Sequence, residues 1–136
     1  VKQLLTLLSR NPDEDLSKSK KNEKLSKDEK LPFRSLFIDE KDEVIYKILM
    51  NMFKAIKILF PDEWANGIWT KTVGYGALIK SLKEIYFIGL EEKDLSEDFF
   101  RKGFMGLSID VDYTSGEKAE MELKNKIVKQ FKKNYE

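Results

Sequence analysis

Apolar side chains recur at three- and four-residue steps between residues 45 and 60, which is the pattern of one face of an α-helix. The recurring residues are Ile45, Ile48, Leu49, Met52, Phe53, Ile56, Leu59 and Phe60. The acidic residues among 39–43 suit the positive end of a helix dipole, and Pro61 marks the end of the pattern. The segment is therefore predicted to be the central helix of the core.

Later segments carry the same helical periodicity. Between residues 72 and 87 the apolar face consists of Tyr75, Leu78, Ile79, Leu82, Ile85 and Tyr86. Between 95 and 107 it consists of Leu95, Phe99, Phe100, Phe104 and Leu107, and in the final segment of Leu123, Ile127, Phe131 and Tyr135. These patterns predict an all-α fold, mainly a bundle of about four to five helices.

Residues 108–113, SIDVDY, alternate apolar and acidic side chains instead. One side carries Ile109, Val111 and Tyr113, and the other carries Asp110 and Asp112. Because a lone strand is not stable, this segment is predicted either to form a short strand pair with RSLFI at 34–38 or to be an extended connector. The two carboxylates could bind a hard cation together, although a solvent-facing pair is the favoured interpretation.

The charge pattern divides the chain into three parts. Residues 1–10 are predicted to form a short N-terminal helix, residues 11–30 a charged flexible linker, and residues 31–136 a helical domain. The linker has two leucines and no aromatic residue, so it buries too little to offset the entropy of ordering. Its lysines could touch phosphates as a basic arm, but the interleaved acids favour a solvated spacer; they are Lys18, Lys20, Lys21, Lys24 and Lys27.

Composition limits the possible functions. The 136 residues suit a single domain, and 25 basic against 24 acidic side chains leave no global field that would attract polyanions. The chain contains neither cysteine nor histidine. Their absence removes thiolate metal sites and the usual general base, so the chain is predicted to be non-catalytic and to need no cofactor.

Residues 72–76, TVGYG, match the loop that forms the selectivity filter of potassium channels. The flanking segments carry too many lysines to span a membrane, so no membrane role is expected. Gly74 and Gly76 are instead predicted to form a packing notch, with Trp64 and Trp69 as large anchors whose indole nitrogens find partners. A phosphate cradle at the start of this helix, beside Lys71, is the alternative.

The final helix carries a lysine-rich face outside its narrow apolar stripe. Its members are Lys124, Lys126, Lys129, Lys132 and Lys133. We predict that this face is the candidate nucleic-acid surface of the chain. Because it contains no arginine, it would position the protein on phosphates without reading bases.

Three stretches between Leu31 and Val128 resemble the C-terminal part of DGQHR-domain proteins. They are LPFRSLF, VIYKILMNMFKAIKILFPDEWANGIWTKTVGYGALIKSLKEIY and YTSGEKAEMELKNKI. DGQHR-domain proteins are bacterial proteins associated with DNA modification and defence islands, and they include the DndB-type proteins linked to DNA phosphorothioation. The Asp-Gly-Gln-His-Arg motif is absent here, so the resemblance implies a C-terminal fragment or a degenerate member and carries over no functional residue.

The resemblance and the lysine face together predict a cytoplasmic accessory domain. It would contact DNA, or a protein of a DNA-modification system, without catalysing a reaction. The opening VKQLLTLLSR turns polar too soon for a signal peptide, which agrees with a cytoplasmic setting. The alternative is a structural or oligomerisation domain with no nucleic-acid role.

Overall fold

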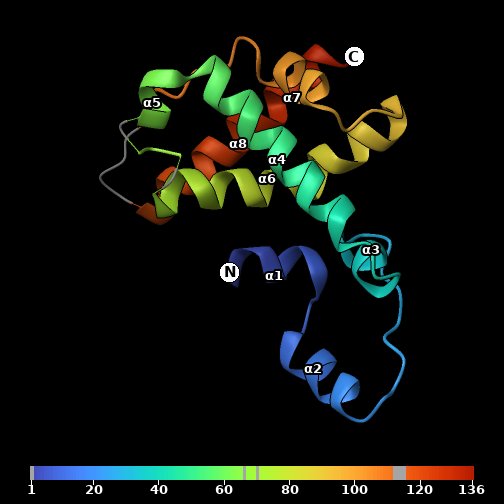
Figure 1. The fold of residues 1–136 in the computed structure, drawn as a ribbon. Helices are drawn as coiled ribbons and strands as arrows, with labels where there is room; N and C mark the ends of the chain where they lie inside the picture. The colour runs from blue at the N-terminus through green and yellow to red at the C-terminus, as the bar shows by residue number, and fades with distance from the viewer. Residues whose placement is uncertain (1, 66, 70, 112–115) are drawn as a thin grey trace.

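The computed structural model describes residues 2–65, 67–69, 71–111 and 116–136, and Figure 1 shows its ribbon. Within these ranges the chain forms eight α-helices and no strand, which confirms the all-α prediction. The helices are α1 (Lys2–Leu8), α2 (Pro12–Lys20), α3 (Arg34–Ile38), α4 (Asp42–Leu59), α5 (Pro61–Ala65), α6 (Thr72–Glu92), α7 (Glu97–Phe104) and α8 (Gly116–Asn134).

Helices α4, α6, α7 and α8 build the body of the molecule. Helix α6 packs along α8, and α7 packs against both α4 and α8. Helix α1 contacts α6 and α3, and α3 contacts α4, so the N-terminal helices are attached along one side of this body. Figure 1 shows α1 and α2 below the body, with α2 projecting furthest from it.

The most buried helix is α6 and not the segment 45–60 that the periodicity favoured. Ten residues of α6 are buried, compared with four in α4. Helix α6 contacts α8 and α1, and its buried residues are distributed around the helix, so it lacks a single dominant apolar face. Helix α4, by contrast, has the clear apolar face of a helix that covers the core from outside.

The segment 11–30 contains a helix that the sequence analysis did not predict. Helix α2 starts after Asn11, whose side-chain oxygen accepts a hydrogen bond from the Glu14 backbone N–H at 3.1 Å. Pro12 occupies a first-turn position where its missing N–H costs nothing. Helix α2 itself has no buried residue. Part of the segment predicted to be a charged flexible linker is therefore helical, and its composition explains why no core forms there.

The prediction of a strand pair between residues 34–38 and the SIDVDY segment is wrong. Residues 34–38 form helix α3, which packs on α4, and the Phe33 backbone N–H donates to the Leu7 carbonyl oxygen at 3.1 Å just before this helix begins. Residues 108–111 have no regular secondary structure, while Asp112 and Tyr113 lie outside the described residues. The helical packing of α3 leaves no extended partner for SIDVDY.

None of the helices in the described ranges combines the length and the apolar character that a membrane span requires. The TVGYG sequence lies in the first turns of α6, where Gly74 and Gly76 are buried. Its residues are therefore helical, with Thr72 exposed and Val73 and Tyr75 partly buried.

Candidate functional site

The orientation of α8 is set by its buried side chains. Leu123, Ile127 and Phe131 are fully buried at four-residue steps, as the sequence predicted, and Val128 is also buried. Because these side chains face α6 and α7, the lysines of α8 lie on its other sides. The candidate nucleic-acid surface is thus held on a rigid element of the core.

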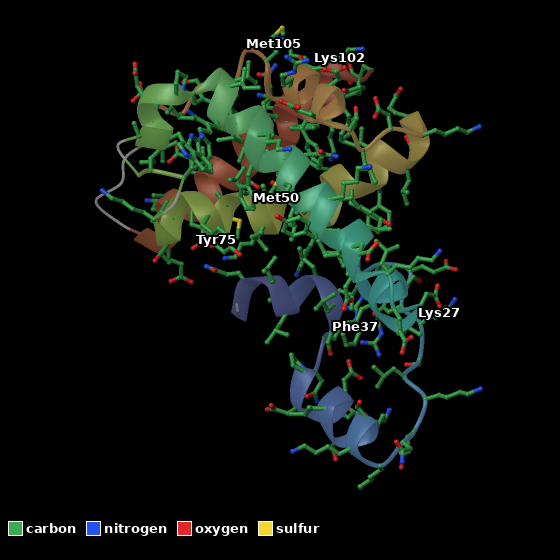
Figure 2. All side chains as sticks on the ribbon, in the orientation of Figure 1. Lys27, Phe37, Met50, Tyr75, Lys102 and Met105 are labelled. Carbon is green, nitrogen blue, oxygen red and sulfur yellow. The ribbon has the colours of Figure 1, made fainter. Side chains whose placement is uncertain are left out.

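Two residues fasten the C-terminal end of α8 to α7. The Tyr135 hydroxyl donates to the Phe99 carbonyl oxygen at 2.6 Å, and burial, with smaller contributions from the charges of Asp94 and Glu92, raises the pKa of Tyr135 to about 12. The Asn134 Nδ2 donates at 2.8–3.0 Å to the carbonyl oxygens of Lys102, Gly103 and Met105. These bonds satisfy carbonyls at the end of α7, which would otherwise lack helical partners. Lys102 and Met105 are visible at the upper edge of Figure 2.

Part of the predicted lysine face is neutralised by α6. Lys124 Nζ lies 3.0 Å from Oε2 of Glu84, and Lys132 Nζ lies 3.9 Å from Oε1 of the same carboxylate. The Glu84 carboxylate thus forms ion pairs with both lysines. Lys124 is the less exposed of the two, so it is the less available for an external ligand.

The remaining lysines have no carboxylate partner among the described residues. Lys126 Nζ donates to the backbone carbonyl oxygen of Asp110 at 2.7 Å, which fixes its position without cancelling its charge. Lys129 and Lys133 are exposed. These three lysines follow one side of α8 at three- and four-residue steps and border a shallow hollow, together with Gln130 and residues 106–108. We call Lys126, Lys129 and Lys133 the lysine row.

The hollow beside the lysine row can hold an anion but offers no catalytic pair. Its other side chains with hydrogen-bonding groups are Gln130 and Ser108, and it contains no carboxylate. Lysine binds phosphate as a point charge and lacks the planar fork with which arginine grips a phosphate or a guanine. The geometry therefore favours contact with a phosphate backbone over recognition of a base.

The predicted packing notch has two unequal halves. A Cβ added to Gly74 would lie 2.0 Å from the carbonyl oxygen of Ile68 and 3.0 Å from the Cα of Trp69, so the backbone of the preceding loop occupies that space. A Cβ at Gly76 would instead meet side chains, 2.1 Å from Glu120 Oε1 and 3.1 Å from Gln3 Nε2. The carbonyl oxygen of Ile68 thus packs directly on Gly74, as a packing notch requires.

Substituting alanine at each glycine should therefore give different results. We expect Gly74→Ala to lower the free energy of unfolding by about 1–3 kcal/mol, because a backbone segment must shift. We expect Gly76→Ala to cost less, because the clash is with the end of the Glu120 side chain, whose shift weakens only its ion pair with Lys80, and because alanine favours helix by about 1 kcal/mol. Urea denaturation of both variants tests this prediction, and equal destabilisation would contradict it.

The two tryptophans differ in burial. Trp69 is 1% exposed and packs on Phe60 with ring centroids 5.8 Å apart, whereas Trp64 is partly exposed and lies 6.4 Å from the ring of Phe53. Nε1 of Trp69 has no hydrogen-bond partner in the described part of the chain. The expectation that each indole nitrogen finds a partner is therefore not met for Trp69. Both residues are packing anchors rather than components of the lysine surface.

The pair Asp110 and Asp112, for which a solvent-facing position was favoured over a cation site, lies partly outside the described residues. Asp112 lies outside the described residues, and Asp110 is exposed. In the described ranges, no group of three or more histidine, cysteine, aspartate or glutamate side chains could hold a metal ion. Of the four acids at 39–43, Asp42 and Glu43 lie in the first turn of α4 and Asp39 and Glu40 precede this helix; they form no such group either.

A buried arginine that was not predicted from the sequence joins the N-terminal helices. Arg34 is 5% exposed, and its guanidinium binds both carboxylate oxygens of Asp15 at 2.5 and 3.2 Å. It also donates to the carbonyl oxygens of Ser26 at 2.6 Å and Leu8 at 3.0 Å. The hydroxyl of Ser9 donates to the same carboxylate. An arginine inside the otherwise apolar run LPFRSLFI was the available signal, because a buried arginine needs a partner.

The pKa of Asp15 gives this junction a defined acid sensitivity. The hydrogen bond from Arg34 is the main cause that lowers the pKa of Asp15 below its ordinary value. A carboxyl with a lowered folded pKa contributes stability above the unfolded pKa of about 3.9 and loses it as the pH falls through the folded value. The pKa of Asp28, lowered by Arg10, acts in the same direction.

We therefore expect α2 to keep its contacts from neutral pH down to about pH 4 and to lose them below it. Amide chemical shifts of residues 12–20, followed by NMR between pH 7 and pH 2, measure this loss. Asp15→Asn should remove most of the acid dependence. A transition of α2 above pH 5 in the wild-type chain would contradict the claim that Asp15 controls the acid sensitivity of this helix.

Comparisons of the chain with protein-family models, with curated proteins and with solved structures give no match.

Proposed function

We propose that this chain is a non-catalytic helical module of a bacterial DNA-modification system, and that it contacts the phosphate backbone of DNA through α8. The observation that carries the proposal is the lysine row, whose three ammonium groups have no carboxylate partner in the described ranges. The resemblance of Leu31 to Val128 to DGQHR-domain proteins supplies the DNA context.

The charge around α8 supports an anionic partner. The five lysines predicted for this surface share it with the carboxylates of Glu84 and Glu136, which line a second hollow on the neighbouring side of the helix. Glu84 pairs with Lys124 and Lys132, so the lysines of this surface that keep an unpaired charge in the described ranges are those of the lysine row, two of which, Lys129 and Lys133, also line the hollow that contains Glu84 and Glu136. A local excess of this kind can bind a polyanion although the net charge of the whole chain is only +1.

The lysine row sets the expected strength and selectivity. Each ammonium group that displaces a counterion from a phosphate contributes a salt-dependent, sequence-independent term. We therefore expect binding in the non-specific range, with a Kd of about 10⁻⁴ to 10⁻⁶ M at physiological salt. No side chain of the row reads a base edge, so affinity should be similar for duplexes of different sequence.

Reversing the charge of the lysine row tests the proposal. We expect K126E/K129E/K133E to weaken binding to a fluorescent duplex at least tenfold at low salt, because three phosphate contacts become repulsions. Fluorescence anisotropy measures the affinity, and circular dichroism checks that the helices remain.

The matched control makes the same charge change on α4. Lys47, Lys54 and Lys57 are exposed, so K47E/K54E/K57E alters the net charge equally without touching α8. Equal weakening by both variants would show that only net charge matters and would contradict the assignment of the row. A wild-type chain without DNA affinity at low salt would favour the alternative, a structural or oligomerisation domain.

A further inference from the structure

The N-terminal helices enclose an apolar groove that the rest of the described chain leaves open. Its volume is about 310 Å³, and its apolar lining consists of Leu5, Leu8, Pro12, Leu16, Leu25 and Phe37. The exposed fractions are 56% for Leu16, 43% for Phe37 and 36% for Leu5. Figure 2 shows Phe37 where α3 approaches α1 and α2. Large apolar side chains gathered at one exposed hollow mark an interaction site more often than scattered ones do.

Helix α2 forms one wall of this groove without being stabilised by a core of its own. It spans nine residues and has no buried residue, and a helix of this length is marginal unless an amphipathic face packs on something. Its attachment is polar, through the bond between Asp15 and Arg34. Leu16, the one large apolar side chain of α2, points its exposed surface at the groove. A ligand that covers Leu16 would supply the missing burial.

The charges at the groove select the chemistry of that ligand. The ionisable side chains that line it are Asp13 and Asp15, both acidic. The carboxylate of Asp15 is already engaged by Arg34 and Ser9, whereas Asp13 is exposed and has no ion-pair partner in the described ranges. A ligand that carries a lysine or arginine at the edge of an apolar face would complement Asp13. A second copy of the chain, packed groove to groove, would place two Asp13 carboxylates in one interface whose lining offers no lysine or arginine, which is unfavourable.

We propose that this groove docks an amphipathic helix of a partner protein, with aliphatic side chains at three- and four-residue steps and a basic residue at the edge. Helix-in-groove recognition has this form, with a few apolar anchors in a hollow and charges at the rim. The volume lies near the lower end of the range of about 300–1,000 Å³ typical of binding pockets, enough for a few aliphatic side chains. This site is separate from α8 and goes beyond the proposed contact with DNA.

A pair of synthetic helical peptides tests the proposal with the full chain. Both carry leucines at i, i+3, i+4 and i+7; one has lysines beside this stripe and the other has glutamates at the same positions. In NMR titrations of the isotope-labelled chain, we expect the lysine peptide to shift amides around Leu5, Leu16 and Phe37. The glutamate peptide should bind about threefold or more weakly, the size expected for an exposed ion pair.

Substitutions on the exposed rim separate docking from folding. Leu16→Asp should weaken the lysine peptide about tenfold, and Asp13→Lys should reverse the preference between the peptides. Leu90→Asp, at an exposed leucine of α6, is the matched control and should leave the affinity for both peptides unchanged.

Equal affinity for the two peptides, or binding unaffected by Leu16→Asp, would overturn the proposal. So would no binding at the highest soluble peptide concentration. Self-association of the chain that Leu16→Asp abolishes, measured by sedimentation equilibrium, would assign the groove to a second copy instead.

Discussion

Replacing Phe131 by alanine is expected to lower the free energy of unfolding by about 3–5 kcal/mol, because the ring is fully buried between α7 and α8. Its centroid lies 4.8 Å from that of Phe104, 5.7 Å from Phe99 and 6.4 Å from Phe100. A Cβ added to Gly103 would lie 2.0 Å from this ring, so the ring packs directly on the backbone of α7. Alanine would leave a cavity that these aromatic neighbours cannot fill.

Urea denaturation monitored by circular dichroism gives the size of this effect. Phe37→Ala is the control, because Phe37 is 43% exposed and its removal should cost far less. A loss below about 1 kcal/mol for Phe131→Ala would show that α8 is not seated on α7 as described. It would also contradict the position assigned to the lysine row, because that position depends on the packing of α8 on α7.

Replacing Arg34 by alanine is expected to lower the free energy of unfolding by about 3 kcal/mol. We also expect α2 to lose its contacts with the rest of the chain. The guanidinium is nearly buried, and its removal leaves the Asp15 carboxylate partly buried without its cation. The carbonyl oxygens of Ser26 and Leu8 also lose a donor. Because α2 has no buried residue, this polar junction is the main attachment that orders it.

Hydrogen exchange distinguishes local from global loss for this variant. Protection of the α2 amides should disappear, while protection in α6 and α8 should remain, because none of their core residues contacts Arg34 through a hydrogen bond or ion pair that the structure describes. Arg34→Lys keeps the charge but not the bidentate contact with Asp15, so we expect protection of the α2 amides between that of the wild type and that of Arg34→Ala. Unchanged protection of α2 in Arg34→Ala would contradict the role of this residue.

The main helices could be predicted from the sequence because their own side chains determine them. The periodic residues of α4, α7 and α8 lie in the core or pack against it, and the helical segment that begins near Thr72 was found, although it extends further than expected, to Glu92. Its end is set by Lys93, which adopts a left-handed conformation with φ of 56°. No pattern of apolar residues reports a lysine in that conformation.

The features that the sequence analysis missed depend on residues far apart in the chain. Helix α2 has one large apolar residue, and its order depends on Arg34, which lies 19 positions beyond Asp15. The short α3 was considered as a strand because RSLFI has no helical period of its own; it is helical where it packs on α4. In both cases tertiary contacts, rather than local preference, decide the structure.

Only part of the candidate surface could be predicted from the sequence, because the ion pairs of its lysines also depend on tertiary contacts. The lysines of α8 are visible in the sequence, but their availability depends on how α6 aligns with α8. That alignment places Glu84 beside Lys124 and Lys132 and leaves the lysine row without a carboxylate. The row is consequently a narrower surface than the five lysines suggested.

The most direct test of the proposed function is the salt dependence of duplex binding, measured by fluorescence anisotropy with plain and phosphorothioate-bearing DNA. Three phosphate contacts predict a slope of log K against log salt concentration of about −3 on the plain duplex. Tighter binding to the sulfur-bearing duplex would support the DNA-modification context. No binding to either duplex at low salt would contradict the claim that α8 contacts DNA.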